Sequence, residues 1–289
     1  MSNVNTIPNR SLKSFPEYKQ FRERIVRNIY EHPVIVSNPY TKKIKTEGFN
    51  RSQVEDLFIQ FSVFSNHFLH IQCKRMVNAP NEDAEREARE ILANEIGISF
   101  VQQDAGGMSV NGGEFRHSWA HINWLRETAA PLNLVPPHIP YPLGHWNLGS
   151  PATHAFLEGL DHSYGSIDGN VGAGASFAIE TWAGFGIDQG TKAEHNNFWK
   201  ELILGLEAFN ERHQRPHGRP ELDLRFFQGH FDIEKLHVET VEREIKDTFG
   251  DTRFDPDQWF EGAGKALHSI YIFWEGLEET YQRLVPCIN

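Results

Sequence analysis

The chain has 289 residues and a mass of 33.2 kDa, enough for one large domain with a substantial buried core. It carries 28 lysines and arginines against 39 aspartates and glutamates, and this formal charge of −11 argues against nucleic acid and anionic membranes as partners. The two cysteines, Cys73 and Cys287, are too few for a disulfide scaffold and are typical of a reducing cytoplasm.

Helical periodicity runs through most of the sequence and predicts an all-α fold. Residues 1–14 have no apolar segment typical of a secretory signal, and we expect a mobile arm there, followed by one domain over 15–289. No run of about 18 apolar residues predicts a membrane span. Helical patterns occupy the segments 15–32, 51–78, 81–97, 117–132, 151–188, 195–213, 224–249 and 256–284, of which 151–188 is interrupted by a glycine-rich patch. We expect seven or so helices in the folded domain. The segments 32–43, 98–112 and 134–150 are predicted to be connections and loops, since they contain prolines or glycines.

The sequence contains 15 histidines, about twice what an average composition leads us to expect. His230, Glu234 and His237 follow one another with helical spacing. At about 100° per residue, these three positions lie within about 60° of each other on one helix face. Asp232 points to another face. Two imidazoles and a carboxylate suit Fe(II), Mn(II) or Zn(II), although a polar, solvent-facing stripe would give the same spacing.

A buried metal needs carboxylates on other helices to balance its charge. Glu180 is the best candidate, because an isolated glutamate in the apolar segment ASFAIETWAGFG is expensive to bury unless it is paired or ligating. Glu95 in ILANEIG and His121 in SWAHINWL are weaker candidates. Glu114 stays open as a rival to Glu95, and His117 as a rival to His121.

In this order, the motifs NEIG, HINWLRETAAPLNL, FAIETWA and FFQGHFDIEKLH resemble the heme-oxygenase-like diiron oxidases. These enzymes are relatives of the thiaminase-II and PQQ-synthesis proteins, and the similarity extends over most of residues 15–245. The chain departs from the family pattern in having Glu234 where an aspartate is usual, and in a longer interval after Glu95. The thiaminase-II activity is disfavoured, because neither cysteine is near these motifs.

The resemblance implies a single heme-oxygenase-like helical bundle with a dimetal site between its core helices. The ligands that it implies are Glu95, His121, Glu180, His230, Glu234 and His237. It further implies two Fe(II) ions with O2 as co-substrate, and a peroxo-diferric species that oxidises a small amino-acid-like or fatty-acid-like molecule. An external electron donor, a homodimer and a cytoplasmic location are also expected.

Several alternatives stay open at this point. The reaction could be desaturation, C–C cleavage, cyclisation or N-oxygenation, and the metals Fe/Fe or Mn/Fe. Polar loops favour an amino acid over a long fatty acid, for which oxidative decarboxylation is the alternative reaction. A metal-free cofactor-binding or cofactor-biosynthesis protein of the same fold, and a helical interaction protein, are the other readings. Arg116, Arg126 and Lys235 are near the predicted ligands and are candidates to hold a charged substrate group.

The glycine-rich segment GNVGAGAS at 169–176 lacks the features of a phosphate-binding loop. It predicts a tight turn or close helix packing just before Glu180. His154, His162, His213 and His217 have no ligand-type partners at helical spacing, and we expect them to be structural or exposed.

Overall fold

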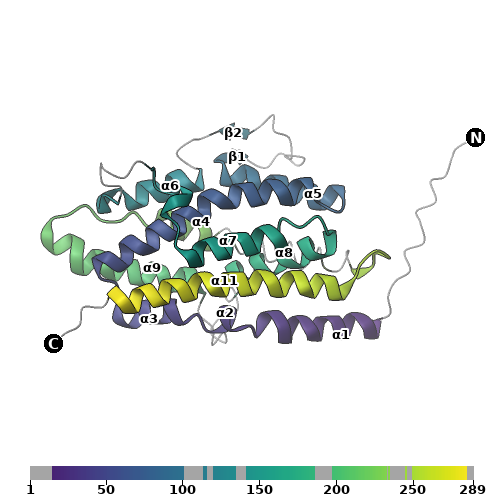
Figure 1. Cartoon of the computed structure of the whole chain (residues 1–289). Helices are drawn as coiled ribbons and strands as arrows, with labels where there is room; N and C mark the ends of the chain where they lie inside the picture. Colours follow the sequence, from purple (N-terminus) through teal and green to yellow (C-terminus); the bar gives the residue numbers. More distant parts are fainter. Residues whose placement is uncertain are drawn as a thin grey trace, which may run out of the picture.

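The protein is helical over nearly all the residues that the computed structural model describes, which are 15–100, 113–115, 120–134, 141–185, 197–232, 234, 245 and 249–284. In Figure 1 the longest helix, α11 (Pro256–Leu284), runs along the length of the bundle. Helices α7 (Pro151–Ser163) and α8 (Gly169–Gly184) pack against one side of α11, and α3 (Pro39–Glu47) also contacts it. The predicted all-α class is therefore confirmed, whereas the predicted arm over 1–14 lies outside the described residues.

The other α-helices are α1 (Phe15–Ile25), α2 (Pro33–Val36), α4 (Arg51–Val77), α5 (Glu82–Glu95), α6 (His121–Ala129) and α9 (Phe198–Phe209). Short π-helical turns occur at Val26–Tyr30 and Asn210–Gln214, and 3-10 turns at Ala130–Leu132, Trp146–Leu148 and Arg215–His217. Residues 225–232 are also helical. The described part of the chain thus contains more α-helices than the seven or so predicted, because some are short pieces of predicted connections.

The two helices that lead to the candidate site begin with strong capping residues. Asn50 caps α4, with its side chain accepting from the Gln53 amide while the Gln53 side chain accepts from the Asn50 amide. Asn81 caps α5, which has three acidic residues in its first turn, where the helix dipole favours them. Although α4 is 27 residues long, neither it nor any other helix among the described residues is apolar enough to cross a membrane.

The segment 32–43, predicted as a connection because of its prolines, contains most of two short helices instead. Each begins with its proline: Pro33 is the first residue of α2 and Pro39 the first of α3. Proline is favoured at this position, since its fixed φ suits the first turn and its missing N–H has no helical partner there. The caps are His32 and Asn38, whose side chains accept from the amides of Val34 and Thr41.

A small antiparallel hairpin interrupts the helical fold after α5. Its strands are β1 (Ile98–Phe100) and β2 (Gly113–Phe115), and Glu114 pairs with Ser99. Figure 1 shows the hairpin beside the end of α5, outside the main bundle. The rival ligand Glu114 is therefore on a strand, and its side chain lies outside the described residues.

The glycine-rich segment forms the first turns of α8, where it allows α8 to touch α11 directly. A Cβ atom on Gly174 would lie 1.8 Å from the carbonyl oxygen of Trp259, and one on Gly262 would lie 1.9 Å from that of Val171. Backbone therefore rests on backbone at two points. Of the two predictions made for this segment, close helix packing is correct and a tight turn is wrong.

Gly174→Ala is expected to lower the free energy of unfolding by about 1–3 kcal/mol, because the added methyl group can only be accommodated if the helices separate. Gly264→Ala is the matched control, since nothing lies within 4 Å of a Cβ at that position of α11. There, alanine should raise stability by about 0.5–1 kcal/mol. Urea unfolding followed by circular dichroism measures both. Equal effects of the two substitutions would contradict the close approach.

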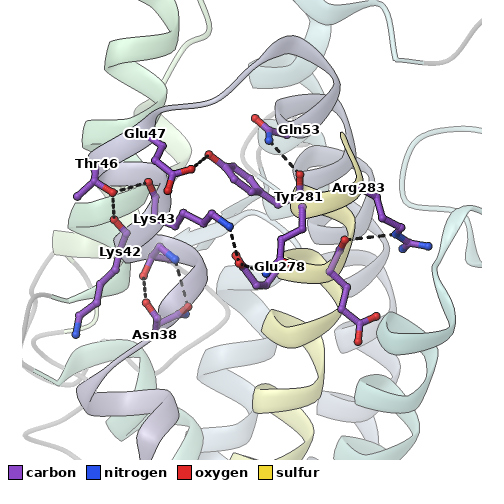
Figure 2. A network of polar contacts seen from close by, with 12 residues as sticks. Asn38, Lys42, Lys43, Thr46, Glu47, Gln53, Glu278, Tyr281 and Arg283 are labelled. Carbon is purple, nitrogen blue, oxygen red and sulfur yellow. Dashed lines mark hydrogen bonds and ion pairs between the residues drawn. The ribbon is translucent and has the colours of Figure 1, made fainter. Parts of the chain in front are cut away.

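Polar contacts hold α3 and the C-terminal part of α11 together, as Figure 2 shows. Lys43 Nζ is 2.9 Å from Glu278 Oε1, and the Tyr281 hydroxyl donates to the carbonyl oxygen of Gly48 at 2.9 Å. Burial raises the pKa of Tyr281 to about 12, and the nearby Glu47 adds to the shift. These contacts join α3 and the residue that follows it to α11 at one end of the bundle.

Candidate functional site

A pocket of about 90 Å³ lies among α4, α5, α6, α8, α9 and the helical segment that begins at residue 225. Most of its wall is apolar, and six of the side chains in that wall are the aromatic residues Phe61, Phe64, Phe68, Trp182, Trp199 and Phe226. Rings of this size exclude water and lower the local dielectric. Polar groups that enter this pocket therefore interact more strongly than they would in solvent.

Five of the six ligand residues predicted from the sequence line this one pocket: Glu95, His121, Glu180, His230 and Glu234. They come from four separate segments of the chain. Glu95 is the last residue of α5, His121 the first of α6, and Glu180 lies in α8. The sixth residue, His237, lies outside the described residues, as do His117, Arg116 and Lys235.

Glu95 and His121 contact each other across the pocket. The Nδ1 atom of His121 is 2.8 Å from Oε2 of Glu95, and the two side chains are only 13% and 14% exposed. The contact joins the end of α5 to the start of α6, over the 25 residues that hold the hairpin. A carboxylate that bonds one ring nitrogen orients the imidazole and makes its other nitrogen more basic.

His230 is held in place by its own helix and by aromatic rings. Its Nδ1 is 2.7 Å from the carbonyl oxygen of Phe226. Since a carbonyl can only accept, Nδ1 carries the proton, and Nε2 is the ring's lone-pair nitrogen in the neutral form. The ring stacks on Trp199 at 4.9 Å and lies 4.5 Å from the ring of His121, measured between centroids.

Two of the carboxylates are buried. Glu180 is 6% exposed and Glu234 is 8% exposed, whereas Asp232, which helix geometry placed on another face, is exposed. Buried carboxylates need compensating positive charge or hydrogen bonds. The pocket therefore has the residue types and the charge balance to receive a cation.

The donor set fits a dimetal centre in kind, since imidazole and carboxylate groups are the usual ligands of non-heme iron. Among the described residues, however, no three His, Cys, Asp or Glu side chains lie close enough together to hold a metal ion. The side chains share one pocket without converging on one point.

The remaining predicted residues lie elsewhere. Arg126, a candidate for holding a charged substrate group, donates from Nε and Nη2 to the carbonyl oxygen of Leu143, at 2.9 and 2.7 Å. His154 stacks on Trp146 at 4.1 Å between centroids, and His162 is exposed. Cys73 is an exposed free thiol.

A second pocket, of about 110 Å³, adjoins the first and was not predicted. The two share Ile91, Asn94 and Glu180 in their walls. Arg75 on α4 lines the second pocket and is only 4% exposed. The sequence contains no signal for this pocket, because the place of Arg75 in its wall depends on how α4 packs against α5.

Tyr164 and Ser176 also line the second pocket. Tyr164 is fully buried, and its hydroxyl donates to Oε1 of Gln72 at 3.1 Å. Burial raises the pKa of Tyr164, and the negative charge of Glu180 raises it further. The phenol therefore stays neutral and serves as a hydrogen-bonding wall of the pocket.

No protein-family model matches this chain, and no curated protein matches it in sequence. Among solved structures, the fold is similar to that of a CADD-like protein of unknown function from Nostoc punctiforme PCC 73102. The sequence identity is 14% and the TM-score 0.53, over 91% of this chain and 96% of the other. At this identity the similarity establishes a shared helical fold and extends to no activity.

Proposed function

We propose that the chain is a heme-oxygenase-like non-heme diiron oxidase that uses O2 to oxidise a small amino-acid-like molecule. The observation that carries the proposal is the gathering of Glu95, His121, Glu180, His230 and Glu234 around one apolar pocket. The order of motifs along the sequence predicts all five of these residues. They lie on segments separated by up to 139 positions along the chain, so chance grouping is a poor explanation.

In this proposal the same five residues, with His237, hold two Fe(II) ions. Two bound Fe(II) ions would supply two of the four electrons that reduce O2 to the level of water, and the substrate would supply the other two as it is oxidised. The residues of the pocket supply negative charge, the orientation of a ligand and the exclusion of water. Glu180 and Glu234 provide buried negative charge, the Phe226 carbonyl fixes the tautomer of His230, and the aromatic wall keeps water away.

The size of the pocket supports a small substrate. A volume of about 90 Å³ is below the roughly 150 Å³ of an apolar cavity that holds benzene. This favours an amino-acid-like molecule over a fatty acid, and oxidative decarboxylation of fatty acids is the weaker alternative.

An anaerobic Fe(II) titration of metal-stripped protein tests the proposal directly. We expect about two irons bound per chain. O2 uptake should then be stimulated by at least one member of an amino-acid panel. One iron per chain would replace the diiron site by a mononuclear one, and no binding would reject the oxidase.

The second candidate is a metal-free protein that binds a small cofactor or its precursor in the same pockets. The Glu95–His121 contact favours it, since these two side chains already satisfy each other at 2.8 Å. The same titration separates the two candidates, because the second predicts no stoichiometric iron. For either candidate we propose a homodimer in the cytoplasm, and for the oxidase an external electron donor. Sedimentation velocity tests the dimer.

A further inference from the structure

Arg75 places a guanidinium group in the wall of the second pocket. It is 4% exposed, and its guanidinium group makes no hydrogen bond or ion pair with any residue that the structure describes. A Cβ on Gly172 would lie 3.7 Å from Nη1, so the group is packed against α8. A guanidinium group that is nearly buried and lines a pocket is suited to a carboxylate, which it binds in a bidentate manner.

The wall of the second pocket carries the opposite charge on another helix. Glu90 and Asn94 of α5 line it together with Arg75 of α4. An anion alone would be repelled by the carboxylates of this pocket. A zwitterion meets both signs of charge, because guanidinium groups bind carboxylates in a bidentate manner and carboxylates bind ammonium groups.

We propose that the second pocket binds the zwitterionic head group of an amino acid, with its carboxylate on Arg75 and its ammonium group at Glu90. The side chain of the ligand then passes Glu180, the wall shared by both pockets, and enters the aromatic pocket. This subsite adds a substrate-binding position to the proposed oxidase, and its role in catalysis rests on that proposed function. It places the α- and β-carbons of the ligand beside the candidate ligand set.

Binding of amino acids to metal-free protein tests the subsite without any turnover. The twenty proteinogenic L-amino acids are screened by thermal shift, and the tightest binder is measured by isothermal titration calorimetry. Its carboxamide and its des-amino acid are measured beside it, since each lacks one of the two charges. We expect Arg75→Met to lower the affinity for the amino acid by about 30-fold and to leave the affinity for the carboxamide unchanged. Glu90→Gln should lower the affinity for the amino acid and leave the affinity for the des-amino acid unchanged.

Thermal unfolding without ligand provides a readout that a purely structural arginine would not give. Arg75→Met should leave the Tm nearly unchanged, because the substitution removes no hydrogen bond or ion pair among the described residues and keeps an apolar side chain of similar length. Arg126→Met is the matched control: its guanidinium donates to the Leu143 carbonyl, so its loss should lower the Tm and leave amino-acid binding intact. A marked fall of the Tm in Arg75→Met, or retained amino-acid binding in that variant, would overturn the subsite. Absence of binding by wild type to every amino acid would do so as well.

The iron titration, run on the same variants, keeps this result separate from the proposed function. Arg75-dependent binding in a protein that takes up no iron would retain the subsite and reject the oxidase. Two irons per chain with no Arg75-dependent binding would retain the oxidase and reject the subsite.

Discussion

Glu180→Gln is expected to reduce Fe(II) affinity and O2 uptake by more than about 100-fold, since changes to residues that merely support metal ligands already cause losses of about 10–100-fold. The amide keeps the shape of the side chain and removes its charge. Glu180 is 6% exposed and lines both pockets, so no solvent-exposed carboxylate can replace it. Equilibrium binding of Fe(II) under anaerobic conditions and an oxygen electrode measure the two effects.

Glu201→Gln is the matched control for this change. Glu201 is another buried carboxylate, 2% exposed, and it accepts a hydrogen bond of 2.6 Å from the Thr41 hydroxyl. It lines neither of the two pockets. Its loss should lower the free energy of unfolding by about 1.5–3 kcal/mol and leave two irons per chain. Equal iron binding by both variants would contradict the role of Glu180.

His230→Ala is expected to abolish stoichiometric iron binding, because it deletes the imidazole whose orientation is set by Phe226 and Trp199. Retained O2 uptake in this variant and in Glu180→Gln would together reject the oxidase. Iron counted per chain after gel filtration measures the loss. Circular dichroism reports separately whether the helix stays folded.

His162→Ala serves as the control for His230, because its local bonding is the same. In α7 the Nδ1 of His162 lies 2.7 Å from the carbonyl oxygen of Glu158, four residues earlier, as His230 does with Phe226. His162 is exposed and lies away from the pocket. Both substitutions remove one such contact, and only that of His230 should affect iron. A similar loss in the two variants would show that the effect comes from the helix.

The sequence was most informative where local physics determines the outcome. The helices α4, α5 and α11 were predicted close to their observed bounds, because apolar periodicity and caps act within a few residues. The prolines at 33 and 39 predict breaks in the sequence pattern, although proline also favours the first turn of a helix. Local composition alone does not distinguish these two roles.

For the site, the residue types and their order along the chain identified the side chains that the fold brings to one pocket. Their role as metal ligands stays a prediction. Arg75 could not be recognised as a pocket residue, because that depends on how α4 packs against α5 and α8. Long-range packing of this kind leaves no spacing pattern in the sequence.

The contact of α8 with α11 has a consequence for how such a protein can change its specificity. Because backbone approaches backbone at Gly174 and Gly262, the distance between α8, which carries Glu180, and α11 is set there by glycine and not by the size of a side chain. Substitutions in the pocket walls on α4 and α9 would then change the size of the pocket while this contact of α8 with α11 is kept.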